Sequence, residues 1–70
     1  MGFIDVLNFL KNKGIEVVEY NENSATFKHN AELIMIVNFY NMELYIHKDS
    51  DEYTIPRYEL EEIDISGGSV

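Results

Sequence analysis

The sequence predicts an α+β fold in which one N-terminal helix packs on an antiparallel sheet of about five strands. Three observations predict this class. Apolar residues recur with a helical period near the N-terminus, the chain after Gly14 alternates between apolar and polar residues, and turn-forming residues divide that part at short intervals. Seventy residues leave room for one domain, which we expect at 1–65 with a disordered tail at 66–70.

The helix is expected over residues 3–13. One apolar face is formed by residues spaced i, i+3, i+4 and i+7, namely Phe3, Val6, Leu7 and Leu10. Gly14 then supplies the left-handed residue that commonly ends a helix. A helix this short is marginal by itself, so it needs a partner surface.

The strands are expected to follow in order from residue 15. Residues 15–20 and 25–28 are predicted as the first two, separated by the turn Asn21-Glu22-Asn23. Residues 31–39 are predicted as the central strand, because they are apolar on both faces. One face would carry Leu33, Met35, Val37 and Phe39, and the other Ile34 and Ile36. Either a homodimer or curling of the sheet into a partial barrel would cover the second face.

The remaining elements are shorter. Residues 42–47 alternate with period two, which predicts Met42, Leu44 and Ile46 inward and Glu43, Tyr45 and His47 outward. A further strand is predicted at 52–55 and ends at Pro56, because proline cannot donate to the ladder. We expect one helical turn at 57–61 and a short last strand at 62–65.

Composition excludes several classes of protein. Hydrophobic residues make up 46% of the chain, which is too many for a disordered segment. The absence of cysteine excludes disulfides and thiolate chemistry. A formal net charge of −8 argues against direct nucleic-acid binding, which needs a basic surface. Without a long apolar run or a basic leader, the sequence predicts neither a membrane protein nor an exported one, so we expect a cytoplasmic protein.

No motif predicts catalysis, a cofactor or a metal site. Asp49-x-Asp51 opens like a calcium loop, but Thr54 and Leu60 stand where that loop needs glycine and glutamate. Two interpretations of this loop remain: a magnesium site, or ordinary solvated carboxylates. The second is the stronger. The two histidines lack metal-ligand spacing, and no glycine-rich loop could hold a phosphate. We therefore expect a protein that is not an enzyme.

The charge is concentrated in the last third of the chain. Seven acidic residues lie there and are the candidate partner-binding residues: Asp49, Asp51, Glu52, Glu59, Glu61, Glu62 and Asp64. One interpretation is a solvated face that keeps a small domain soluble. The other is a surface that attracts a basic partner. Carboxylates at i and i+2 of a strand stand about 6.7 Å apart, close to two phosphate steps of DNA, about 6.8 Å. Three pairs have this relation in the sequence: Asp49 and Asp51, Glu59 and Glu61, and Glu62 and Asp64.

In size, acidity, lack of cysteine and acidic C-terminal third, the chain resembles small phage-encoded DNA-mimic proteins, including inhibitors of the bacterial histone-like nucleoid protein HU. The resemblance implies a non-enzymatic host-takeover inhibitor that occupies the DNA-binding surface of an HU-like protein in the bacterial cytoplasm. Two alternatives stay open. One is a phage or bacterial protein–protein interaction module that binds through its five tyrosines and an apolar sheet face. The other is a small enzyme or metal-binding domain.

Overall fold

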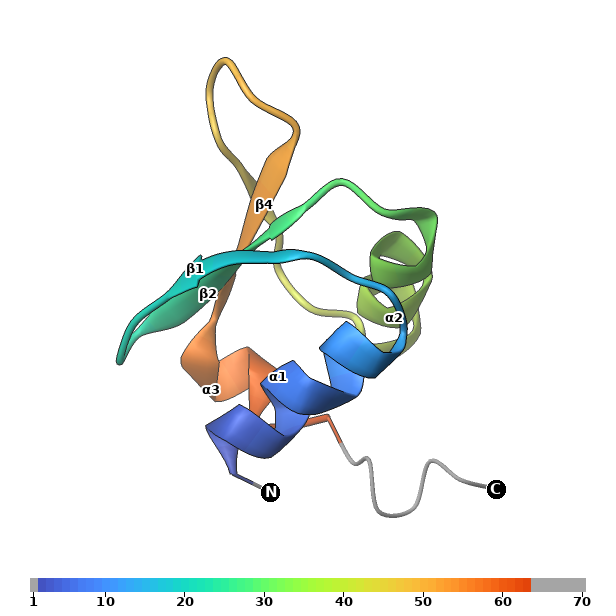
Figure 1. Cartoon of the computed structure of the whole chain (residues 1–70), viewed down its shortest axis with the longest axis vertical. Coiled ribbons are helices and arrows are strands. Elements are labelled where there is room, and N and C mark those ends of the chain that lie inside the picture. Colours follow the sequence, from blue (N-terminus) through green and yellow to red (C-terminus); the bar gives the residue numbers. More distant parts are fainter. Residues whose placement is uncertain (1, 64–70) are drawn as a thin grey trace.

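Residues 2–63, the part of the chain that the computed structural model describes, form three helices with a pair of strands between each helix and the next (Figure 1). They are α1 (Phe3–Asn12), β1 (Val17–Tyr20), β2 (Ser24–Lys28), α2 (Ala31–Tyr40), β3 (Tyr45–Ile46), β4 (Glu52–Pro56) and α3 (Arg57–Leu60). The predicted α+β class, with an N-terminal helix on an antiparallel sheet, is confirmed, although the sheet has four strands rather than five. The disordered tail predicted at 66–70 lies outside the described residues.

The sheet is antiparallel throughout, with strand order β1-β2-β4-β3. β2 lies inside the sheet and pairs with β4 over its full length, from Ser24 opposite Pro56 to Lys28 opposite Glu52. β3 and β4 form a hairpin whose loop extends away from the helices (Figure 1). The loop therefore holds its side chains far from the hydrophobic core.

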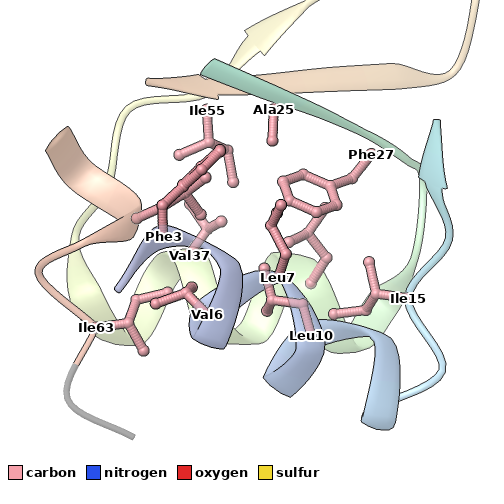
Figure 2. Close-up of a cluster of buried hydrophobic side chains, with 12 residues drawn as sticks. Phe3, Val6, Leu7, Leu10, Ile15, Ala25, Phe27, Val37, Ile55 and Ile63 are labelled. Atoms are coloured by element: carbon pink, nitrogen blue, oxygen red, sulfur yellow. The ribbon is translucent and has the colours of Figure 1, made fainter. Parts of the chain in front are cut away.

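The core fills the space between the sheet and the helices. Ala25 and Phe27 of β2 alternate with Thr26, so both point to the helical side of the sheet, where Ile55 of β4 joins them (Figure 2). The buried apolar residues are Phe3, Val6, Leu7, Leu10, Ile15, Ala25, Phe27, Leu33, Val37, Ile55, Leu60 and Ile63. All four residues of the helical face predicted for the N-terminal helix are among them.

The segment predicted as a central strand is helix α2, so that prediction is wrong. The side-chain oxygen of Asn30 accepts hydrogen bonds from the backbone N–H groups of Glu32 and Leu33, at 2.8 and 3.3 Å, and caps the first turn. Asn41 ends the helix in the left-handed conformation, at φ 56°. With helical spacing, Leu33 and Val37 face the core together. The second apolar face therefore belongs to a helix rather than to a sheet.

The predicted strand over residues 42–47 is shorter than expected. Only Tyr45 and Ile46 pair with β4, and residues 42–44 form an irregular link from α2. Met42 and Leu44 pack against the core as predicted, but Ile46 is 68% exposed, because β3 is a two-residue edge strand at the base of the hairpin.

The last part of the described chain bears out one prediction and corrects another. The helical turn near 57–61 is α3, which follows Pro56 directly. Glu62 and Ile63 do not form the predicted last strand: Glu62 belongs to a turn after α3 and Ile63 is irregular, and residues 64–65 lie outside the described part. Among the described residues, no helix is both long and apolar enough to cross a membrane.

Candidate functional site

The structure separates the predicted acidic residues into two groups at opposite ends of β4. Asp49 and Asp51 lie in the β3–β4 loop, with Glu52 at the first position of β4. Glu59 lies in α3, and Glu61 and Glu62 follow it. Asp64 is outside the described residues. The five residues of β4 span about 13 Å, which exceeds the Debye length of about 8 Å at physiological salt. The two groups therefore act as separate charged surfaces.

Backbone groups fix the β3–β4 loop that carries Asp49 and Asp51. Asp49 adopts a left-handed conformation at φ 63°, which aspartate tolerates in turns. The backbone carbonyl of Asp51 accepts a hydrogen bond of 2.7 Å from the N–H of His29, and the N–H of Glu52 donates to the Ser50 hydroxyl at 3.2 Å. These contacts fix the loop, while the side chains of Asp49 and Asp51 stay exposed.

Glu43, which lies far from α3 in the sequence, lies close to the acidic residues in and after α3. The backbone N–H of Glu43 donates to Oε2 of Glu59 at 2.9 Å, so the link after α2 lies against α3. The hydroxyl of Tyr45 in turn donates a short hydrogen bond to the carboxylate of Glu43. Two segments separated by sixteen positions thus form one surface.

Two exposed tyrosines complete this surface, which we call the acidic tyrosine cluster: Glu43, Tyr45, Tyr58, Glu59 and Glu62. The hydrogen bond to Glu43 and the charge of its carboxylate raise the pKa of Tyr45 to about 12. Partial desolvation raises the pKa of Tyr58, and the charges of Glu59, Glu43 and Glu62 raise it further. Tyr45 and Tyr58 are 52% and 62% exposed. The carboxylate charges thus contribute to both raised pKa values, after the hydrogen bond at Tyr45 and the desolvation at Tyr58.

Few cations oppose these carboxylate charges. Two ion pairs form among residues 2–63: Lys13 with Glu32 at 3.9 Å, and Arg57 with Glu61 at 3.5 Å. Glu61 is therefore partly neutralised, although it stands next to Glu62 in the sequence. Within the described chain, Glu43, Glu59 and Glu62 have no lysine or arginine within 4.0 Å. These three carboxylates can therefore attract a basic partner, as can those of Asp49, Asp51 and Glu52 in the hairpin, which form no ion pair with a described residue either.

The strand spacing that suggested phosphate mimicry is absent from the described pairs. Asp49 and Asp51 lie in a loop, and Glu59 and Glu61 lie in and just after α3, where consecutive positions do not rise by a strand step. The third pair, Glu62 and Asp64, extends beyond residue 63. Among the described residues, any likeness to DNA therefore lies in charge, not in a ladder of evenly spaced carboxylates.

A hollow of about 430 Å³ lies between the start of α1, the β1–β2 turn and the start of α3. Phe3 and Tyr20 form its apolar wall, with ring centroids 6.1 Å apart. Arg57 is its one basic lining residue and lies 4.8 Å above the Phe3 ring. Because Arg57 already pairs with Glu61 and Asp5 also lines the hollow, it offers no excess positive charge for an anion.

The carboxylates and histidines of residues 2–63 are dispersed. No three carboxylate or histidine side chains of that range gather closely enough to hold a metal ion. His47 contacts the hydroxyl of Thr54 through Nε2, and the ring of His29 lies 5.7 Å from that of Tyr53. Both histidines thus have structural partners on the sheet.

Sequence reasoning missed Glu43 and did not place Tyr45 and Tyr58 beside the acidic residues. Glu43 was placed on the outward face of a strand, and nothing in its neighbours indicates a contact with Glu59. The contact becomes visible only in the folded structure, because the segment between α2 and β3 lies beside α3. Comparison of the chain with models of known protein families, with curated proteins and with solved structures found no match.

Proposed function

We propose that this protein is a non-enzymatic acidic DNA mimic that binds a basic DNA-binding protein of a bacterial host, such as the nucleoid protein HU, and occupies its DNA-binding surface. The observation that carries the proposal is the acidic tyrosine cluster. It brings three carboxylates without a cation in contact around two exposed tyrosines. On this proposal, the protein acts in the cytoplasm of the host.

The physical basis is electrostatic steering followed by close contact. A concentrated negative surface speeds encounter with a positive one and favours its register. Concentrating like charges also costs stability through repulsion, which a protein tolerates most readily where the charge has a use. Tyr45 and Tyr58 add large, stiff rings that are common in protein interfaces. A lysine-rich or arginine-rich surface would contact both kinds of group.

The test is a competition measurement with purified HU and a fluorescent DNA duplex. We expect the protein to displace the duplex and to lose affinity for HU as salt rises from about 100 mM to about 500 mM, where the Debye length falls to less than half. The triple variant Glu43→Gln, Glu59→Gln, Glu62→Gln removes three charges but keeps the acceptor oxygens. Exposed ion pairs contribute about 0.2–1 kcal/mol each, so Kd should rise about 3- to 150-fold.

The hairpin supplies a matched control. The variant Asp49→Asn, Asp51→Asn, Glu52→Gln also removes three charges, but at the other end of β4. A smaller effect of this variant would assign binding to the acidic tyrosine cluster. Equal effects would show that net charge alone acts and would overturn the proposed site. Absence of competition at low salt would overturn the proposed partner class. Competition that survives high salt and depends on Tyr45 and Tyr58 would favour the interaction-module alternative.

A further inference from the structure

The outward face of α2 is largely apolar and has no partner among the described residues. Met35 and Phe39 are 62% and 80% exposed. They stand one helical turn apart, at i and i+4, and therefore share a face. The opposite face carries the buried residues Leu33 and Val37. Asn38, three positions after Met35, is exposed on the same side, so the outward face is largely rather than wholly apolar.

The neighbouring side chains extend this apolar face. Ile34 and Ile36 are only half-buried and flank the exposed stripe. The ring of Tyr40 packs edge-on against that of Phe39, with centroids 5.0 Å apart. The surface is therefore broader than two isolated side chains.

The same stretch is also free of charge. Residues 33–42 contain no lysine, arginine, aspartate or glutamate, although the whole chain has 18 such residues. Glu32, the one acid of α2, forms an ion pair with Lys13. Two copies that each carry a net charge of −8 repel one another over most of their surfaces. Apart from Glu32, which lies one turn before Met35 and is paired with Lys13, this face lets two copies approach without opposing carboxylates.

We infer that a second copy of the chain covers this face, through a two-fold packing of α2 on α2. In an antiparallel pair of identical helices, Phe39 of one copy meets Met35 of the other, and the reverse contact forms by symmetry. A thioether against an aromatic ring is a favourable contact, and methionine adapts its shape to the site. A membrane surface is a poor alternative, because an acidic protein is repelled by anionic headgroups.

The exposed area predicts a weak dimer. A large aromatic side chain buries about 150–250 Å² when fully covered. Phe39 and Met35, with their present exposures, therefore supply only a few hundred Å² per copy. Stable complexes bury about 1,200–2,000 Å² in total, so this contact belongs to the weak class, with Kd of roughly 10–500 µM.

Sedimentation equilibrium from about 10 µM to about 1 mM, a range that spans this Kd, tests the inference. We expect the mean mass to rise from 8.2 kDa towards twice that value as concentration increases. Phe39→Ala should raise the Kd of the dimer at least about tenfold, because it removes most of the exposed apolar area. Ile4→Ala is the matched control. Ile4 is 51% exposed but lines the hollow beside Tyr20 and Arg57.

Salt separates this dimer from the proposed acidic contact. Salt screens the repulsion between two acidic copies, so about 500 mM salt should leave the dimer unchanged or strengthen it. Circular dichroism should show unchanged folding of both variants, since each alters an exposed side chain. A monomer at every concentration, equal effects of Phe39→Ala and Ile4→Ala, or dissociation by salt would each overturn the inference. None of these outcomes bears on competition with DNA.

Discussion

The backbone N–H of Glu43 donates a hydrogen bond to Oε2 of Glu59 at 2.9 Å and thereby fastens the link after α2 to α3. The bond holds two carboxylate-bearing residues close together against their mutual repulsion. It depends on an acceptor at position 59 rather than on a negative charge. Its contribution to folding and its contribution to partner binding can therefore be separated by the choice of substitution.

Substitution of Glu59 should distinguish these two contributions. Glu59→Ala removes the acceptor, and we expect the free energy of unfolding to fall by about 0.5–1 kcal/mol, since the bond is solvent-exposed. Glu59→Gln keeps an acceptor oxygen and relieves repulsion within the acidic tyrosine cluster, so it should leave stability nearly unchanged. Urea unfolding of both variants measures the difference. Equal losses in the two would mean that the charge, not the hydrogen bond, maintains this contact.

The titration of Tyr45 reports the contact between its hydroxyl and Glu43. Its pKa is raised to about 12 by the hydrogen bond to Glu43 and by the charge of that carboxylate. Glu43→Gln should lower the pKa towards the ordinary value of 10. The Tyr45→Phe variant identifies its contribution to the absorbance of ionised tyrosine, or NMR can follow the ring directly. An unchanged pKa in Glu43→Gln would show that Glu43 does not raise the pKa of Tyr45.

The sign of the associated stability change follows from linkage. A tyrosine whose pKa is raised on folding keeps its proton in the folded state after the unfolded chain has lost it. The stabilising contribution of Tyr45 is therefore complete below about pH 10 and is lost as the pH rises towards 12. In Glu43→Gln this loss should be smaller, which urea unfolding at pH 9 and at about pH 11 can detect.

Much of the fold was predictable because local patterns and tertiary packing agree. The period of Phe3, Val6, Leu7 and Leu10 predicts α1, and tertiary packing buries those same four residues. The segment 31–39 failed because its apolar residues satisfy both a strand period and a helix period. Its length favoured a helix, and Asn30 is a good N-cap residue as well as a turn residue.

The candidate site was less predictable. The concentration of acids after residue 48 is visible in the sequence, but their division into two groups depends on the length and direction of β4. The hydrogen bond from Glu43 to Glu59 forms only because α2 is a helix, which places the segment after it beside α3. The incorrect strand at 31–39 therefore concealed the acidic tyrosine cluster. It also placed the unpartnered apolar face on a sheet instead of on α2.

The cap of α2 offers a test of the helix itself. Asn30→Ala removes the acceptor of the two N–H groups at 2.8 and 3.3 Å, and we expect a loss of about 1 kcal/mol in the free energy of unfolding. Asn30→Asp keeps the acceptor and should cost less. Asn38→Ala, at an exposed position of the same helix, is the control and should change stability by only a few tenths of a kcal/mol. If Asn30→Ala were no more harmful than Asn38→Ala, the cap would contribute nothing.

The end of α1 depends on the backbone freedom of Gly14. Gly14 adopts φ 82°, a conformation that side chains with a Cβ rarely adopt. A Cβ added there meets no atom within 4 Å, so the cost of Gly14→Ala comes from the backbone alone. We expect about 1–2 kcal/mol of destabilisation, measured by urea unfolding. Gly14→Asn should cost less, because asparagine tolerates the left-handed region better than alanine does. Equal costs for the two substitutions would show that something other than this conformation constrains the turn into β1.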